Sequence, residues 1–229
     1  MKLKTTAVLF GLMMGVAGTP AQAVVLINDL TPGLYNSGIG TVLDGTSFMF
    51  PPANSSGGDP DLDIPSGTPP DLSPASGALG NWLTNTSTPT GTGWGAAPQL
   101  IPASWAVDTE TAIIYTLNGG FSNVIASIGV DNGIFVWLNG VFLGGHLDPG
   151  GVGLNEYSFA LSLIPGLNYL QVLREDHGGA TGYSIEVTGD VAAVPLPAAL
   201  PLLASGIAGF GWLSRRRRSR LNRDAAAAA

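Results

Sequence analysis

The hydrophobic pattern of the second half of the chain is that of short β-strands. From residue 111 onward, β-branched and aromatic residues occur in short runs separated by Gly, Asn, Asp or Pro, and helical periodicity is missing. The runs predict strands at 111–117, 124–130, 134–138, 141–143, 157–163, 169–173 and 183–187. The runs 134–138 and 141–143 are separated by two residues alone, Asn139 and Gly140. A two-residue Asn-Gly connection between strands is typical of a type I′ β-hairpin. The pattern predicts an all-β fold, an antiparallel β-sandwich or jelly roll.

Alternation within residues 134–138 predicts that this strand has two different faces. Phe135 and Trp137 fall on one face, and Ile134, Val136 and Leu138 on the other. The segment Val130-Asp131-Asn132-Gly133, continued to Asn139-Gly140, and the later Pro165-Gly166-Leu167-Asn168 resemble the galactose-binding-like jelly rolls of carbohydrate-binding modules. The resemblance covers residues 113–187 and implies a β-sandwich more strongly than a ligand.

The first 23 residues have the layout of a signal peptide. Lys2 and Lys4 precede an apolar stretch at 7–16, and Ala21-Gln22-Ala23 forms an A-x-A cleavage site. At the other end, residues 194–213 are uncharged, and 20 helical residues reach roughly the ~30 Å of a bilayer core. We therefore expect a single C-terminal transmembrane helix.

A basic cluster follows that apolar run. Arg215, Arg216, Arg217 and Arg218 are expected to anchor the C-terminus, with the tail 219–229, in the cytoplasm by the positive-inside rule. The segment 194–218 resembles the PEP-CTERM sorting signal of exported bacterial proteins, with Val194, Pro195, Leu196 and Pro197 at the motif and Leu196 where that motif usually has Glu. This resemblance implies an exosortase-like membrane protease as a partner. It also implies a chain held transiently in the cytoplasmic membrane and then located at the cell surface or outside the cell.

Charge and cysteine content restrict what the exported body, 24–193, can do. The body has 15 acidic residues and one basic residue, Arg174, so nucleic acid is excluded as a partner. Cysteine is absent, which leaves core packing, oligomerisation or metal binding to stabilise it. Residues 24–110 form a Pro/Gly-rich, partly irregular N-terminal part: 51–102 contains ten prolines and eight glycines. The segment 111–193 is the predicted β-sandwich core region.

Two groups of polar residues are candidates for binding. Arg174, Asp176 and His177 lie just before Gly178-Gly179 and could form a ligand loop; the alternative is that Arg174 pairs with an acid and anchors the loop. Asp59, Asp61 and Asp63 alternate along an extended segment, where carboxylates suit Ca²⁺; the alternative is a solvated acidic loop. No nucleophile elbow, zinc spacing or phosphate-binding loop accompanies them, so we expect no enzyme activity and no catalytic residue.

The tryptophans divide into two sets. Trp137 is expected in the core, whereas Trp82 and Trp94, in a Gly/Thr-rich stretch, are candidates for an exposed aromatic platform. Together these features predict a non-enzymatic, exported envelope or extracellular-matrix protein, associated with exopolysaccharide. The alternatives are a lectin-like carbohydrate-binding module and, third, a secreted glycoside hydrolase that uses paired carboxylates.

Overall fold

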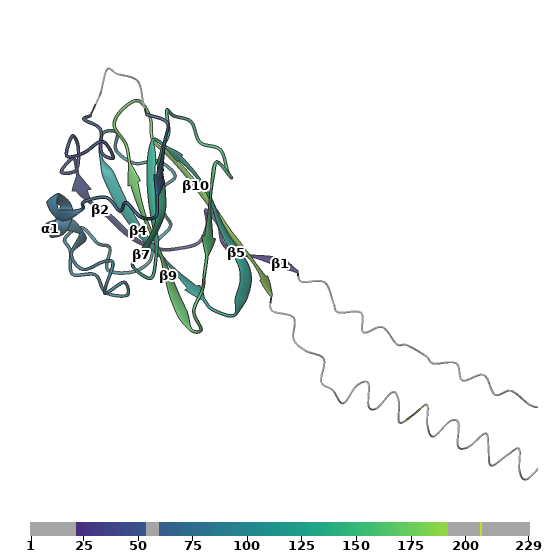
Figure 1. Cartoon of the computed structure of the whole chain (residues 1–229). Coiled ribbons are helices and arrows are strands. Elements are labelled where there is room, and N and C mark those ends of the chain that lie inside the picture. Colours follow the sequence, from purple (N-terminus) through teal and green to yellow (C-terminus); the bar gives the residue numbers. More distant parts are fainter. Residues whose placement is uncertain (1–21, 54–59, 192–206, 208–229) are drawn as a thin grey trace, which may run out of the picture. The chain divides into compact units, whose positions relative to one another are not determined.

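Two antiparallel sheets face each other in the computed structural model, which describes residues 22–53, 60–191 and 207 (Figure 1). The four-stranded sheet has the order β1 (Ala23–Ile27), β10 (Gly182–Val191), β5 (Phe121–Asp131) and β8 (Tyr157–Leu161). The six-stranded sheet has the order β2 (Leu34–Gly40), β4 (Glu110–Asn118), β9 (Leu167–Glu175), β6 (Gly133–Leu138), β7 (Val141–Leu147) and β3 (Leu62–Pro65). The predicted all-β antiparallel sandwich is confirmed.

All seven predicted strands are present, with different ends. The largest extensions are those of β7, which continues to Leu147, and of β10, which continues to Val191, whereas β8 ends at Leu161. Strands β1, β2 and β3 come from the N-terminal part and were not predicted. A short 3₁₀ turn (Ser73–Ala75) and the one-turn helix α1 (Ser76–Leu79) also lie there. Residues 22–53 and 60–191 belong to one compact unit, so both predicted regions of the body contribute to the same sandwich.

The core has two hydrophobic layers, which lie on opposite sides of the six-stranded sheet. The inner layer fills the space between the sheets and includes Ile134, Val136 and Leu138. The outer layer includes Phe135 and Trp137, which pack against Phe50 and Trp82 from the irregular segments before β4. Every side chain of β6 is buried, and the predicted assignment of its two faces is confirmed. The Pro/Gly-rich segments thus serve as the outer cover of this sheet.

The tight turns fix how strands follow one another. Asn139 and Gly140 have φ values of 52° and 79°, as a type I′ turn requires, and Leu138 pairs with Val141 across it. The predicted hairpin is confirmed. At the other end of β6, Asn132 carries the chain from β5 in one sheet to β6 in the other.

The predicted targeting segments fall almost entirely outside the described residues. Residues 1–21 of the signal peptide and the whole of the motif, Val194 to Pro197, and of the arginine cluster, Arg215 to Arg218, are not described. In the part of the chain that is described, no helix has the length and hydrophobicity to cross a membrane.

Candidate functional site: a groove between the edges of the two sheets

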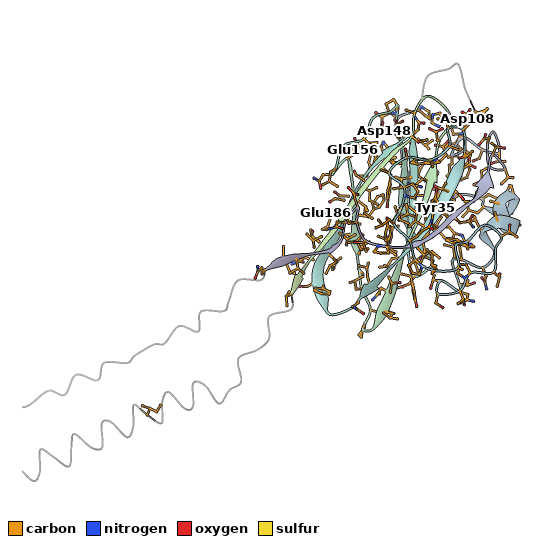
Figure 2. The ribbon with its side chains drawn as sticks, turned by 180° about the vertical axis from the view of Figure 1, so that it is seen from behind. Tyr35, Asp108, Asp148, Glu156 and Glu186 are labelled. Carbon is orange, nitrogen blue, oxygen red and sulfur yellow. The ribbon has the colours of Figure 1, made fainter. Side chains whose placement is uncertain are left out.

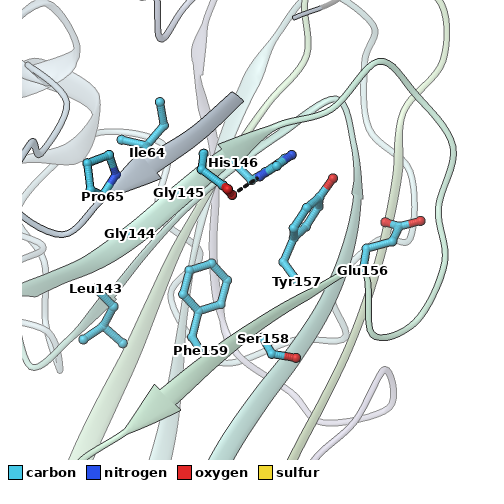
Figure 3. A pocket seen from close by; sticks show the side chains of 11 residues that line it. Ile64, Pro65, Leu143, Gly144, Gly145, His146, Glu156, Tyr157, Ser158 and Phe159 are labelled. Carbon is cyan, nitrogen blue, oxygen red and sulfur yellow. Dashed lines mark hydrogen bonds and ion pairs between the residues drawn. The ribbon is translucent and has the colours of Figure 1, made fainter. Parts of the chain in front are cut away.

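An open groove lies where the β3–β7 edge of one sheet meets β8, the edge strand of the other (Figure 3). Its volume is about 440 Å³. The residues that line it are Asp63, Ile64, Pro65, Leu143, Gly144, Gly145, His146, Glu156, Tyr157, Ser158 and Phe159. Edge strands have unpaired outer sides, so this boundary is a place where a sandwich can accept a ligand.

His146 forms the polar end of the groove. In the β3–β7 pairing Asp63 lies opposite His146, and its carboxylate is 2.8 Å from the Nδ1 atom of the imidazole. Asp61, two residues earlier and so on the same side of the extended chain, contacts Nε2 at 3.2 Å. The imidazole ring is largely buried, whereas the side chain of Asp63 is 95% exposed. The two carboxylates thus hold His146 in place and still face solvent.

Aromatic rings form the other side of the groove. Tyr157 and Phe159 lie two residues apart on β8 and therefore on the same face of the strand. The ring of Tyr157 stacks on the His146 ring, with centroids 4.0 Å apart and planes 25° apart (Figure 3). The Tyr157 hydroxyl donates a hydrogen bond to the Asp148 carboxylate, which fixes the ring. Both aromatic side chains are half-buried and pack against the inner core layer, so part of each ring is available to a ligand.

Gly144 keeps the groove open. A Cβ atom at this position would lie 3.6 Å from the Phe159 ring and 3.1 Å from the carbonyl oxygen of Ile64. Gly145 points to the other face of β7, where a Cβ atom would lie 2.7 Å from the Phe135 ring of the outer layer. A side chain at position 144 would fill the space beside Phe159. The bare backbone at Gly144 therefore lets a ligand approach the aromatic rings.

The predicted ligand loop turns inward instead. Arg174 is fully buried; its guanidinium donates hydrogen bonds to Thr111 Oγ1 (2.9 Å) and to the Pro102 carbonyl (2.8 Å). Its Cζ atom lies 4.1 Å from the ring centroid of Trp105 and 4.9 Å from that of Tyr183, and this burial lowers the pKa of Arg174.

Asp176 and His177 are buried as well. Asp176 Oδ2 accepts a hydrogen bond from the backbone N–H of Asp108, and His177 Nδ1 lies 2.9 Å from Glu175 Oε1. Burial of Arg174, Asp176 and His177 favours the alternative, in which this segment anchors the fold. The alternative expected Arg174 to pair with an acid, whereas its guanidinium packs against aromatic rings.

Glu175 belongs to a set of buried acids on the outer side of the six-stranded sheet. Burial, with Asp44 adjacent, raises the pKa of Glu110 to about 10. Burial also raises the pKa of Glu175 to about 7, although His177 opposes that rise, and the pKa of Asp176 to about 6. Glu110 is therefore protonated at neutral pH, and this cluster makes the stability of the fold depend on pH.

The acidic segment predicted as a calcium loop has a different arrangement from the one expected. Asp59 lies outside the described residues, and Asp61 and Asp63 direct their carboxylates at His146. Within 22–53 and 60–191, no group of three or more His, Asp or Glu side chains is placed to hold a metal ion. The structure therefore offers no ligand set for the predicted Ca²⁺ among these residues.

The sequence misplaced the accessible aromatic residues. Trp82 is 2% exposed and packs edge-on against Trp137, with centroids 5.3 Å apart, so its assignment to an exposed platform is wrong. Trp94 is half-buried, and its indole N–H donates to the Leu79 carbonyl. The core assignment of Trp137 is confirmed. Tyr157 and Phe159 were not predicted as site residues, although their alternation in a predicted strand was a usable signal.

Comparisons with known proteins add little to this picture. No protein-family model matches the chain, and no curated protein matches it. Among solved structures, the chain is similar to a PA14 sugar-binding domain from an RTX adhesin. The two share 15% sequence identity, the match covers 69% of this chain and 90% of that one, and the TM-score is 0.34. Similarity at this level does not indicate what this chain binds, so its function is inferred from the groove.

Proposed function

We propose that the chain is a carbohydrate-binding domain whose ligand lies in the groove between β3–β7 and β8. The observation that carries this proposal is the combination of the half-buried rings of Tyr157 and Phe159 with the exposed carboxylate of Asp63 at one open groove. Sugar rings have apolar C–H faces that pack on aromatic rings, and hydroxyl groups that donate to carboxylates. The groove volume of about 440 Å³ lies within the range of small-ligand sites, roughly 300–1,000 Å³.

The proposal is one of binding without catalysis. Asp63 is engaged by His146, and the carboxylate of Glu156 accepts a hydrogen bond from the backbone N–H of Val130 at 3.2 Å. We propose that these carboxylates hold neighbouring groups in place or accept hydrogen bonds from a ligand, and do not transfer protons. This supports the lectin-like alternative of the sequence analysis over a glycoside hydrolase.

Replacing Phe159 tests the proposed site. Phe159→Ala is expected to weaken binding of an oligosaccharide up to about tenfold, because the variant loses a stacking surface. Isothermal titration calorimetry of the full-length chain, in a detergent without a sugar headgroup, measures this change against a panel of neutral oligosaccharides.

Phe121 provides a matched control. It is also a partly buried phenylalanine that packs on the inner core layer, but it lies on β5 and does not line the groove. Phe121→Ala should leave the affinity unchanged. Equal losses in the two variants would assign the effect to folding and contradict the proposed site.

We further propose that this domain works outside the cytoplasm, in contact with exopolysaccharide. The support is the sequence alone: a signal-peptide layout at 1–23 and a motif, apolar run and arginine cluster at 194–218. An exosortase-like protease would cut near Val194 to Pro197 and separate the acidic body from its anchor.

Mass spectrometry of the extracellular protein tests this route. A mature N-terminus at Val24 and a C-terminus that lacks the arginine cluster are the expected result. An extracellular chain that retains Arg215 to Arg218 would contradict the cleavage, and a chain found only in the cytosol would contradict export.

A further inference from the structure

Resting on the proposed carbohydrate binding, we infer that the groove selects sugars that carry an N-acetyl group over sugars that carry a hydroxyl group at the same position. Two features of the groove support this selectivity. One is an unpaired strand edge, that of β8, which offers main-chain amide groups to a ligand. The other is a methyl-sized space beside the Phe159 ring, where Gly144 has no side chain.

The side-chain donors that point into the groove are already engaged. The Tyr157 hydroxyl donates a hydrogen bond to the Asp148 carboxylate. Both nitrogens of the His146 imidazole lie beside carboxylates, Nδ1 at 2.8 Å from Asp63 and Nε2 at 3.2 Å from Asp61. Hydrogen-bond donors for a ligand must therefore come from the main chain.

The hydrogen bonds of the four-stranded sheet show which main-chain groups are unpaired. Val130 on β5 donates its backbone N–H to the Glu156 carboxylate, so this N–H points toward the β8 side. Glu156 lies near Asp148 in Figure 2, and both carboxylates are bound to protein groups. Ile185 on β10 donates its backbone N–H to Asp29, which follows β1, so this N–H points away from β5. Since these directions alternate along an antiparallel strand, both observations indicate that the even-numbered residues of β5 hydrogen-bond with β8.

The outer edge of β8 therefore has unpaired main-chain groups. Residues 157, 159 and 161 lie opposite residues 128, 126 and 124 of β5 and are the hydrogen-bonded ones. The N–H and C=O groups of Ser158 and Ala160 then point away from β5, at the open edge beside the groove (Figure 3). In the described part of the chain, no backbone hydrogen bond joins them to another segment. Both donors and acceptors of these residues are thus free to meet a ligand next to the Phe159 ring.

An acetamido group matches both features of the groove. Its N–H and C=O groups are those of a peptide, so it can pair with the edge of β8 as a neighbouring strand would. A carbon atom at the Cβ position of Gly144 would lie 3.6 Å from the Phe159 ring, which is an ordinary contact, so the acetyl methyl group has room there. Burial of this methyl group against the ring is favourable. A hydroxyl group offers neither the carbonyl nor the methyl group, so the sugar that carries it should bind less tightly.

A matched pair of oligosaccharides tests the inference on the full-length chain, in a detergent without a sugar headgroup. The probes are a β-linked N-acetylglucosamine tetramer and a β-linked glucose tetramer, which differ only in the acetamido group. Calorimetric titration measures both affinities. We expect the acetylated tetramer to bind about tenfold more tightly, because it adds amide hydrogen bonds and buries a methyl group.

Proline variants of the two edge strands of the sheet locate the effect. Ala160→Pro removes an N–H that faces the groove, and edge strands accept proline where the N–H is not part of the ladder. The preference for the acetylated tetramer should fall several-fold in this variant. Val25→Pro is the matched control on β1, the opposite edge: the Gln22 carbonyl accepts a hydrogen bond from Val191, so the N–H of Val25 faces away from β10. It should keep the natural preference, and an equal loss in both variants would assign the effect to the stability of the sheet and overturn the inference.

NMR titration of the natural chain tests the contact without a substitution. The backbone N–H signals of Ser158 and Ala160 should move downfield as the acetylated tetramer binds, because these groups gain hydrogen-bond acceptors. If the tetramer bound while both signals stayed in place, the inference would be wrong.

The remaining outcomes separate the two proposals. Equal binding of the two tetramers, or tighter binding of the glucose tetramer, would overturn the N-acetyl inference and support carbohydrate binding. Absence of binding by both tetramers and by the whole panel of neutral oligosaccharides would contradict the proposed function itself.

Discussion

Lowering the pH from about 8 to about 5 is expected to stabilise the sandwich, because its buried acids bind protons more tightly in the folded state than in the unfolded chain. The pKa of Glu110 rises from 4.5 in the unfolded chain to about 10 on folding, and that of Glu175 from 4.5 to about 7. The stabilisation from a raised pKa is complete below the unfolded value of 4.5. It is lost as the pH rises through 7 for Glu175 and toward 10 for Glu110.

The size of this effect follows from the pKa difference. Between these limits each pH unit changes the free energy of unfolding by up to about 1.4 kcal/mol for Glu110 alone. Asp176 changes in the same direction, since its pKa rises to about 6. Urea unfolding at a series of pH values, with the midpoint as the readout, measures the trend. A protein that loses stability between about pH 8 and about pH 5 would contradict the protonated state of these acids.

A single substitution isolates the contribution of Glu110. Glu110→Gln has the shape of the protonated acid, so at about pH 8 it should raise the free energy of unfolding by ~4–5 kcal/mol and flatten the pH dependence. Near pH 5 the variant and the natural chain should be about equally stable. Glu186→Gln, the same change on β10 outside the cluster, is the control and should keep the natural pH dependence. A Glu110→Gln variant that keeps the full pH dependence of the natural chain would contradict the protonated state of Glu110.

Replacing Arg174 should be the most destabilising change among the polar residues of the core. Arg174→Met removes a guanidinium that lies against Trp105, Tyr183 and Tyr35 and donates to Thr111 and Pro102. The Pro102 carbonyl would lose its donor, and three aromatic rings would lose a cation, with an expected cost of ~3–5 kcal/mol. The fall in the urea midpoint measures this cost.

Arg174→Lys separates charge from shape. Lysine keeps a positive charge beside the rings but lacks the planar group that reaches Thr111 and Pro102 together, so it should restore roughly half of the loss. If Arg174→Met were as stable as the natural chain, the rings and hydrogen bonds around the guanidinium would not offset the cost of burying it, and our account of this residue would be wrong.

The sequence predicted the strands whose own residues have a clear β pattern. The runs from 111 onward are rich in β-branched residues, and β6 could be assigned two faces because both are apolar. Strands β2 (LYNSGIG) and β3 (LDIP) have no such pattern, since Gly, Asn, Asp and Pro interrupt their apolar residues. They are strands because β4 and β7 offer unpaired edges to them.

The groove could not be predicted because its parts are distant in the sequence. Asp63, His146 and Tyr157 come from β3, β7 and β8, and only the β3–β7 register and the meeting of two sheet edges bring them together. The sequence did single out Asp61 and Asp63 as polar residues of interest, but it assigned calcium to them, since their partner His146 lies 83 residues away from Asp63. Burial of Arg174 was also invisible, because its aromatic partners come from separate segments around positions 35, 105 and 183.

The most direct test of carbohydrate binding at the groove is NMR mapping of the labelled chain during titration with an oligosaccharide that binds. Chemical-shift changes should concentrate at Asp63 in β3, Gly144 to His146 in β7 and Glu156 to Phe159 around β8. Signals from the outer layer, such as those of Trp82 and Trp137, should stay in place. Saturable changes confined to any other face of the sandwich, with β3, β7 and β8 unperturbed, would contradict the account.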